Sequence, residues 1–194
     1  GFMSTLKADM KRNYILDKAR DVFIQKGFAA VTMKDIVEAC DISRGGLYRY
    51  YGSTREIFLA LFQRDAKEEL ERVEVAIWEE MSARDILFSY MKRQKCAFEQ
   101  ERTTLSNAAY EFFLENPDDR VIFQWQFDGI SEMLREILEY GVRKGEFVLP
   151  DTAAFARHLA LFINSMQLSL PLLNFPGPRI EEQFGLLLRP ILAS

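Results

Sequence analysis

The sequence contains few residues that could bind a metal ion. Its 194 residues include one histidine, His158, and two cysteines, Cys40 and Cys96, far apart in the chain. Metal sites need several such ligands at short spacing, so we expect no metal. A disulfide between the two cysteines is one alternative. We favour the other, two buried thiols in a reducing cytosol.

The sequence also lacks the patterns that mark membrane proteins, secreted proteins and common enzymes. It has no apolar run of 18 residues, and its first residues, GFMSTLKADMKRN, lack the apolar segment of a signal peptide. No glycine-rich phosphate loop and no G-x-S-x-G motif occur. We therefore expect a cytoplasmic protein with no membrane partner, no enzymatic activity and no cofactor.

Charge is distributed unevenly along the chain. The net charge is −4, which argues against a general nucleic-acid binder. Residues 1–55, however, contain 10 Lys and Arg against 6 Asp and Glu, whereas residues 56–194 contain 15 against 23. A basic segment followed by an acidic one is expected when one end of a protein contacts phosphate, although chance is the alternative for so modest an excess.

Helical patterns dominate, and no stretch alternates as a strand does, so the predicted fold class is all-α. Breaks at Asn116-Pro117, Gly145 to Asp151 and Pro176-Gly177-Pro178 separate long helices. The predicted helices span residues 11–27, 32–40, 44–51, 53 to about 80, 83–100, 104–115, 118–144, 152–173 and 178–192.

The first three helices are short, and their ends carry clear signals. Gly27 is a C-terminal stop, and Thr32 with Asp35 forms a capping box for the second helix. Asp41, one of the few non-glycine residue types that tolerate a left-handed backbone, lies in the turn that follows. Ser43 and Ser53 are suited to cap the third and fourth helices. A tight turn between two short helices is the plan of a helix-turn-helix.

The third helix, in the segment DISRGGLYRYY, has a composition suited to the DNA major groove. Gly45 and Gly46 weaken a helix by roughly 1 kcal/mol each relative to alanine, but their lack of side chains lets the backbone approach base edges. Arg44 lies at the N-terminal end, where recognition helices contact bases, and arginine binds guanine O6 and N7. Tyr48 and Tyr50 offer hydroxyls to phosphates.

Other residues of this region have structural interpretations. Leu47 and Tyr51 are expected to pack in the core, and Arg44 and Arg49 could belong to a merely solvated face. Thr32 is first a helix cap, although its exposed hydroxyl at a helix N-terminus could also bind a phosphate. The predicted DNA-binding residues are Thr32, Ser43, Arg44, Gly45, Gly46, Tyr48, Arg49, Tyr50 and Arg55.

Residues 27–58, GFAAVTMKDIVEACDISRGGLYRYYGSTREIF, resemble the TetR family of bacterial transcriptional repressors. The resemblance is carried by Gly27, Phe28, Thr32, Ile36, Ile42, Ser43, Tyr48 and Tyr51, and it covers about the first 58 residues. Farther on, GVRKGEF (141–147), followed by Asp151 and a long apolar helix, is also similar. The resemblance implies a helix-turn-helix domain followed by a helical domain that binds a small effector and then releases DNA.

The sequence departs from the family pattern at three positions. Asp41 replaces the usual turn glycine, and Gly46 replaces a threonine that often contacts DNA. Thr54 replaces a lysine that binds a phosphate at the start of the fourth helix. Arg55 could supply that contact, although its direction differs by about 100° around the helix.

The larger segment, residues 56–194, has an excess of aromatic and thioether side chains. A Phe-rich solid core is one interpretation, and a cavity for a small, largely apolar effector is the other. The predicted effector-binding residues are Phe98, Tyr110, Phe113, Phe123, Phe127, Met133, Phe162 and Met166. The polar residues that could orient a ligand are Asn107, Tyr110, Gln124, Asn164 and Gln167.

The last two helices carry more apolar surface than one packed face needs, which suits a two-fold interface. In the resembled family a four-helix dimer seam forms at this place. The predicted interface residues are Leu161, Leu168, Leu172, Phe184, Leu187, Leu188 and Ile191.

The sequence therefore predicts two domains, a helix-turn-helix at 1–55 and an effector-binding and dimerisation domain at 56–194. The predicted function is that of a ligand-responsive regulator, a repressor, which binds a palindromic double-stranded operator as a homodimer. The alternative is a helical ligand- or protein-binding module that no longer binds DNA.

Overall fold

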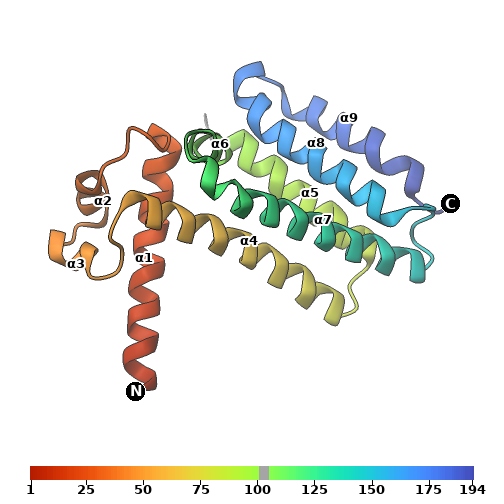
Figure 1. Cartoon of the computed structure of the whole chain (residues 1–194). Helices are drawn as coiled ribbons and strands as arrows, with labels where there is room; N and C mark the ends of the chain where they lie inside the picture. The colour runs from red at the N-terminus through yellow and green to blue at the C-terminus, as the bar shows by residue number, and fades with distance from the viewer. Residues whose placement is uncertain (101–104) are drawn as a thin grey trace.

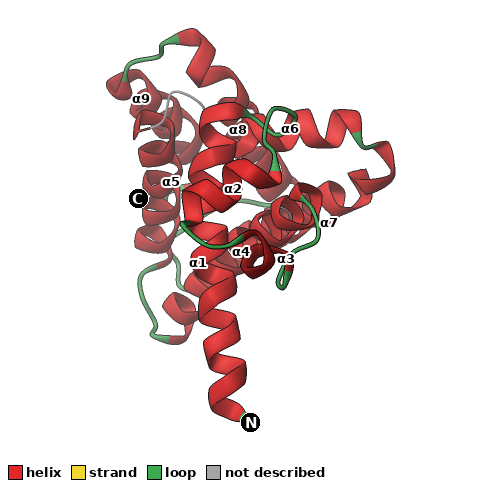
Figure 2. Ribbon diagram, turned by 90° about the vertical axis from the view of Figure 1, so that its left-hand side faces the viewer, coloured by secondary structure: helices red, strands yellow, loops and turns green. Residues whose placement is uncertain are grey.

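The protein is built from α-helices (Figures 1 and 2). The computed structural model describes residues 1–100 and 105–194, except for the side chains of residues 96–100. The α-helices are α1 (Phe2–Lys26), α2 (Met33–Cys40), α3 (Arg44–Tyr48), α4 (Thr54–Trp78), α5 (Ala83–Gln100), α6 (Leu105–Glu115), α7 (Arg120–Arg143), α8 (Thr152–Leu173) and α9 (Gly177–Leu188). Short 3-10 helices lie at η1 (Pro117–Asp119) and η2 (Arg189–Ile191). The all-α prediction is confirmed.

Most helix boundaries agree with the sequence prediction, and the differences have local causes. Helix α1 begins at Phe2 instead of residue 11, because no proline or glycine interrupts residues 2–10. Helix α3 ends at Tyr48 and is followed by a turn, instead of continuing to residue 51. The last predicted helix divides into α9 and η2 just before Pro190, which cannot donate a helical hydrogen bond.

The helices form two parts joined by α4 (Figure 1). Helices α2 and α3 lie against α1 at one end of the molecule, and the N-terminal part of α1 projects beyond them. Helix α4 leads from this end into a bundle in which α7 packs most extensively on α8. Helix α9 lies on the outer side of the bundle, beside α8 (Figure 1). This arrangement places the basic N-terminal segment at one end of the acidic bundle.

Two hydrophobic clusters stabilise the chain. One lies in the bundle and includes Leu134, Ile137 and Leu159, each fully buried. The other contains buried residues of α1, α2, α3 and α4, together with Phe112 of α6. The ring of Phe112 lies 4.9 Å from that of Phe58, between ring centres. Helix α6 therefore belongs to the core of the N-terminal end, although it is more than 50 residues away in sequence.

Helix α6 also holds the turn between α1 and α2. Gly27 ends α1 with φ 76°, in the region that favours glycine. The Glu111 carboxylate accepts hydrogen bonds from the backbone N–H groups of Phe28 at 3.1 Å and Ala29 at 2.8 Å. A Cβ on Gly27 would lie 2.4 Å from a carboxylate oxygen of Glu111. The predicted helix stop is confirmed, and close approach by Glu111 is a second reason for glycine.

The segment GVRKGEF turns the chain between α7 and α8. Phe147 is buried against Gly141 of α7, where a Cβ would lie 2.0 Å from the phenylalanine ring. Backbone N–H groups of Glu146 and Phe147 donate to the carbonyl of Gly141, at 2.8 and 3.2 Å. The glycine therefore lets an aromatic side chain close the end of the bundle.

In the described residues, no helix is long and apolar enough to cross a membrane. The same residues contain no group of three or more His, Cys, Asp or Glu placed to hold a metal ion. Cys40 is a buried free thiol, and burial raises its pKa. The side chain of Cys96 lies outside the described residues.

Candidate DNA-binding interface and ligand cavity

Helices α2 and α3 form the predicted helix-turn-helix. The Thr32 hydroxyl accepts a hydrogen bond from the N–H of Asp35 at 3.2 Å, and the Asp35 carboxylate accepts one from the N–H of Thr32 at 2.9 Å. These two bonds are the predicted capping box. The hydrogen bond from the Thr32 N–H lowers the pKa of the Asp35 carboxyl, and a hydrogen bond from Lys26 adds to the effect. Asp41 ends α2 in the left-handed conformation, with φ 50° and ψ 48°, as predicted.

The orientation of α3 is fixed by one buried face. Leu47 is fully buried, and Tyr51 is 8% exposed, so both pack in the core as predicted. The Ser43 hydroxyl caps the helix by accepting a hydrogen bond from the N–H of Gly46 at 3.0 Å. The opposite face of α3 is therefore presented to solvent.

That exposed face carries the predicted base-contacting arginine. Arg44, Gly45, Tyr48 and Arg49 are exposed. The guanidinium of Arg44 lies 5.7 Å from the centre of the Tyr48 ring, which supports it from one side. A Cβ on Gly45 would meet no atom within 4 Å, so this position is open to an approaching molecule.

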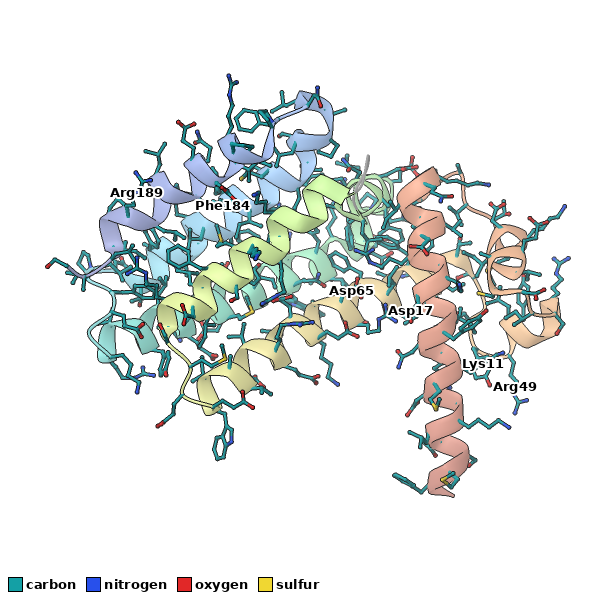
Figure 3. The ribbon with its side chains drawn as sticks, turned by 180° about the vertical axis from the view of Figure 1, so that it is seen from behind. Lys11, Asp17, Arg49, Asp65, Phe184 and Arg189 are labelled. Carbon is teal, nitrogen blue, oxygen red and sulfur yellow. The ribbon has the colours of Figure 1, made fainter. Side chains whose placement is uncertain are left out.

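Helix α1 adds basic groups to the same end of the molecule. The guanidinium of Arg12 lies 5.5 Å from the centre of the Tyr50 ring, and the Tyr14 hydroxyl donates to the carbonyl of Cys40 at 2.9 Å. Figure 3 shows Lys11 and Arg49 on the same side of α1. Lys11 and Arg12 were not among the predicted DNA-binding residues, because no local sequence pattern places α1 beside α3.

Arg55 is exposed but not free. It forms an ion pair with Asp119 of η1, with a shortest nitrogen–oxygen distance of 2.6 Å. Thr54, beside it, is half-buried at the start of α4. Ser53 caps this helix as predicted, with its hydroxyl accepting from the N–H of Glu56 at 3.2 Å.

A cavity of about 340 Å³ lies between α1, α4, α5, α6, α7 and α8. Of the predicted effector-binding residues, Tyr110, Phe123 and Phe127 line it. Among the predicted orienting residues, Asn164 and Gln167 line it as well, whereas Asn107 and Gln124 do not. The apolar part of the lining also includes Phe62, Leu105, Ile130 and Ile163.

Four of the predicted effector-binding residues lie elsewhere. Phe113 packs against Phe62 and Phe123 in the N-terminal core without lining the cavity. Met133 and Met166 are buried in the core of the bundle, and Phe162 packs against Phe184 of α9. Their assignment to the cavity is corrected, because their helix faces point toward neighbouring helices. The side chain of Phe98 lies outside the described part of the structure.

A polar part of the lining was not predicted from the sequence. It consists of Arg20, Asp65, Glu69, Tyr90, Arg93, Gln94, Ser106 and Gln126. Charged residues on long helices usually face solvent, so no local signal separates these from their exposed neighbours.

The outer face of α8 and α9 is partly apolar. Leu161, Leu172 and Leu186 are 56%, 86% and 61% exposed, and Leu168 and Leu187 are half-buried. Phe184, Leu188 and Ile191 are instead buried in the core of the same chain, and Figure 3 shows Phe184 between α9 and α8. Burial within their own chain leaves these three side chains little surface for a partner, so the proposed interface does not include them. Leu186, which the sequence prediction did not include, is exposed on the same helix.

The chain is similar to known regulators in sequence and fold. Residues 15–61 match the tetR family of bacterial regulatory proteins. An uncharacterized HTH-type transcriptional regulator of Bacillus subtilis (strain 168), YfiR, is 30% identical over 142 residues, covering 72% of this chain and 69% of that protein.

Two solved structures share the fold at low sequence identity. One is E. coli NemR in its reduced form, with a TM-score of 0.79 and 17% identity, covering 95% of this chain and 99% of that one. The other is a proposed transcriptional regulator from Saccharomonospora viridis in complex with choline, with a TM-score of 0.76 and 17% identity, covering 96% and 100%. Family match, relative and fold agree: the chain belongs to the tetR family of bacterial regulatory proteins and is a transcriptional regulator.

Proposed function

We propose that this regulator is a homodimeric repressor that binds a palindromic operator and is released by a small-molecule effector. The DNA-binding part of this proposal is supported by the solvent-facing surface of α3, where Arg44 lies beside the open backbone of Gly45. Helices of this kind enter the major groove, and arginine there binds guanine. Such binding would take place in the bacterial cytoplasm, where the operator DNA lies.

Phosphate contacts would hold α3 in place. Tyr48, Arg49 and Tyr50 lie on or just after the recognition helix, and Thr32 is exposed at the N-terminus of α2. Hydroxyl, guanidinium and helix N-terminal N–H groups are common partners of phosphate oxygens. We propose that Ser43 and Gly46 act with them mainly by fixing the start of α3.

Residues 1–55 are the proposed DNA-binding domain and residues 56–194 the effector and dimerisation domain. Exposed leucines of α8 and α9 support a two-fold interface there, because a monomer gains nothing from leaving several leucines in water. Two copies would present their recognition helices to successive major grooves, roughly 34 Å apart.

The cavity is the proposed effector site. Helix α4 lines it with Phe62, Asp65 and Glu69, and its first turn adjoins the recognition helix. A ligand that changes the position of α4 would therefore change the distance between the two recognition helices of the dimer. The ligand can shift this equilibrium only by its difference in affinity for the two states, typically about 1 to 3 kcal/mol.

Selection from a random double-stranded DNA library tests the DNA-binding proposal. We expect enrichment of an inverted repeat, with affinity that falls steeply as salt concentration rises. A protein that enriches no sequence and shows no salt-dependent binding would instead be the ligand- or protein-binding module.

Calorimetric titration of an effector with and without the selected operator tests the induction proposal. By linkage, DNA must weaken effector binding by the same factor by which the effector weakens DNA binding. Equal affinities in the two titrations would show that the compound is bound but is no inducer.

A further inference from the structure

The charges in the cavity lining are already paired with one another. Arg93 of α5 donates two hydrogen bonds to the Glu69 carboxylate of α4, the one from Nε at 3.0 Å. Arg20 of α1 lies 3.4 Å from the carboxylate of Asp65. These two arginines and two acids are the charged side chains of the described lining, and their formal charges cancel.

Amide and hydroxyl groups form a second polar part of the lining. The Ser106 hydroxyl donates to Gln167 at 3.1 Å, and Gln167 donates in turn to Gln94 at 3.2 Å. Asn164 donates to the Tyr110 hydroxyl at 3.0 Å. Side-chain amides contain both donors and acceptors, so this region can match a neutral polar group of either kind.

Tyr90 supplies a donor to the same cavity. Its side chain is 3% exposed, and within the described part of the chain its hydroxyl has no hydrogen-bond partner. Burial raises its pKa, and the nearby Glu69 adds to the effect, so the hydroxyl keeps its proton. A buried donor without an acceptor is costly, and a bound molecule with an oxygen acceptor would remove that cost.

The remaining lining is apolar and aromatic. Phe123, Phe127 and Ile130 are contributed by successive turns of α7, and Phe62 and Ile163 by α4 and α8. An aromatic or branched hydrocarbon body fits such a surface, because burial of its apolar area is favourable.

From these groups we infer that the effector is an uncharged amphiphile: an aromatic or branched apolar body with a carbonyl or hydroxyl oxygen that accepts a hydrogen bond from Tyr90 or from the amides. The inference rests on the proposed function, in which this cavity is the effector site. It replaces the largely apolar effector expected from the sequence.

A charged ligand fits this cavity less well. An anion would compete with Glu69 for Arg93, and a cation would compete with Arg93 for Glu69. In either case one member of a half-buried ion pair would lose its partner, which is strongly unfavourable in a protein interior. A neutral ligand leaves both ion pairs intact.

Three naphthalene probes of matched shape test the inference: neutral 2-acetonaphthone, anionic 2-naphthoate and cationic 2-naphthylmethylammonium. We expect calorimetry at neutral pH to show at least about tenfold tighter binding of the neutral probe. Equal or tighter binding of a charged probe, or no binding of any of the three, would overturn the inference.

Two variants test whether Glu69 and Tyr90 cause the selectivity for the neutral probe. Glu69→Gln leaves Arg93 without its counter-charge, so naphthoate affinity should rise about tenfold relative to 2-acetonaphthone. Tyr90→Phe keeps the ring, and it should reduce the preference for 2-acetonaphthone over 2-ethylnaphthalene by several-fold, roughly the effect of one hydrogen bond. If Glu69→Gln shows no cooperative melting and is therefore misfolded, the test depends on Tyr90→Phe alone. An unchanged preference of Tyr90→Phe for 2-acetonaphthone over 2-ethylnaphthalene would overturn the inference.

Measurement of operator binding distinguishes a failure of the effector inference from a failure of the proposed regulator function. Wild-type protein should bind the selected operator in the absence of probe. If the wild-type protein binds the operator but shows no preference for the neutral probe, the effector inference is overturned and the regulator proposal stands. A wild-type protein that binds no operator would overturn the regulator proposal, whatever the probes show.

Discussion

The guanidinium of Arg55, in the first turn of α4, donates to both carboxylate oxygens of Asp119 in η1, from Nε at 3.0 Å and from Nη2 at 2.6 Å. Arg55 is half-exposed, whereas Asp119 is 14% exposed. The pair joins the start of α4, beside the recognition helix, to the segment that leads into α7. A phosphate at this position would compete with Asp119 for the same guanidinium.

Asp119→Asn is expected to tighten operator binding, because Arg55 would no longer be held by a carboxylate. If Arg55 then contacts a phosphate, the slope of log affinity against log salt should steepen by about 1. Fluorescence anisotropy across a salt series measures both quantities. The matched control is Asp118→Asn, the same charge change at the exposed neighbour. Equal effects of the two variants would show that general charge, not Arg55, is responsible.

Arg44→Ala is expected to weaken operator binding by about 1 to 3 kcal/mol and to relax base preference at one position in each half-site. Tyr48→Phe retains the ring under the Arg44 guanidinium but removes the hydroxyl. It should therefore weaken binding to all sequences alike, because phosphate contacts carry no sequence information. Competition between operator variants distinguishes the two effects. Unchanged affinity and preference in Arg44→Ala would remove it from the proposed base contacts.

Glutamate at Leu161 or Leu168 is expected to break the proposed dimer, since both lie on the outer side of α8, two turns apart. Burying a carboxylate in an apolar interface costs several kcal/mol, on the order of the stability of many dimers. Leu114→Glu, at a leucine of α6 with 66% exposure, is the control. Sedimentation velocity should give monomers for the first two and dimers for the control. Dimers in all three would place the interface elsewhere.

Glu146 is expected to make stability depend on pH. Burial acts to raise its pKa, but hydrogen bonds from the Ser82 hydroxyl and the N–H groups of Ala83 and Arg84 outweigh it, so its pKa lies below the ordinary 4.5. A lowered carboxyl pKa contributes stability that is present above the unfolded-state value and lost as the pH falls through the folded-state value. Glu146→Gln should therefore melt lower than wild type at pH 7, with the difference shrinking below pH 4.5. A constant difference across this range would contradict the assignment.

The helix-turn-helix was predictable because its signals are local. Thr32 and Asp35 satisfy each other's backbone groups within one turn, and Asp41 adopts a conformation that few other residue types tolerate. Neither feature requires knowledge of the remaining chain. The helix predicted at residues 44–51 extends too far, because helical propensity alone does not show where tertiary packing ends a helix.

The cavity was predicted only in part, because its lining depends on how several helices are rotated. Phe123 and Phe127 face it, whereas Phe113 and Met133, of similar apolar character, face other helices. Both kinds of position are apolar and at least half-buried, so hydrophobic periodicity cannot separate them. Glu69 and Arg93 were missed for the opposite reason, since each belongs to a charged stretch of a long helix, and such stretches usually face solvent.

The position of Phe112 in the N-terminal core limits how this regulator could be recombined with others. A fragment ending at residue 55 would lack Phe58 and Phe112, which pack against each other and against Phe28. A chimera that keeps this DNA-binding segment on a foreign bundle would thus need matching aromatic side chains on the incoming helix, and a carboxylate equivalent to Glu111. We therefore expect hybrid regulators to be stable when α6 is transferred together with α1 to α4. Hybrids whose junction lies at the start of α4 are expected to be unstable.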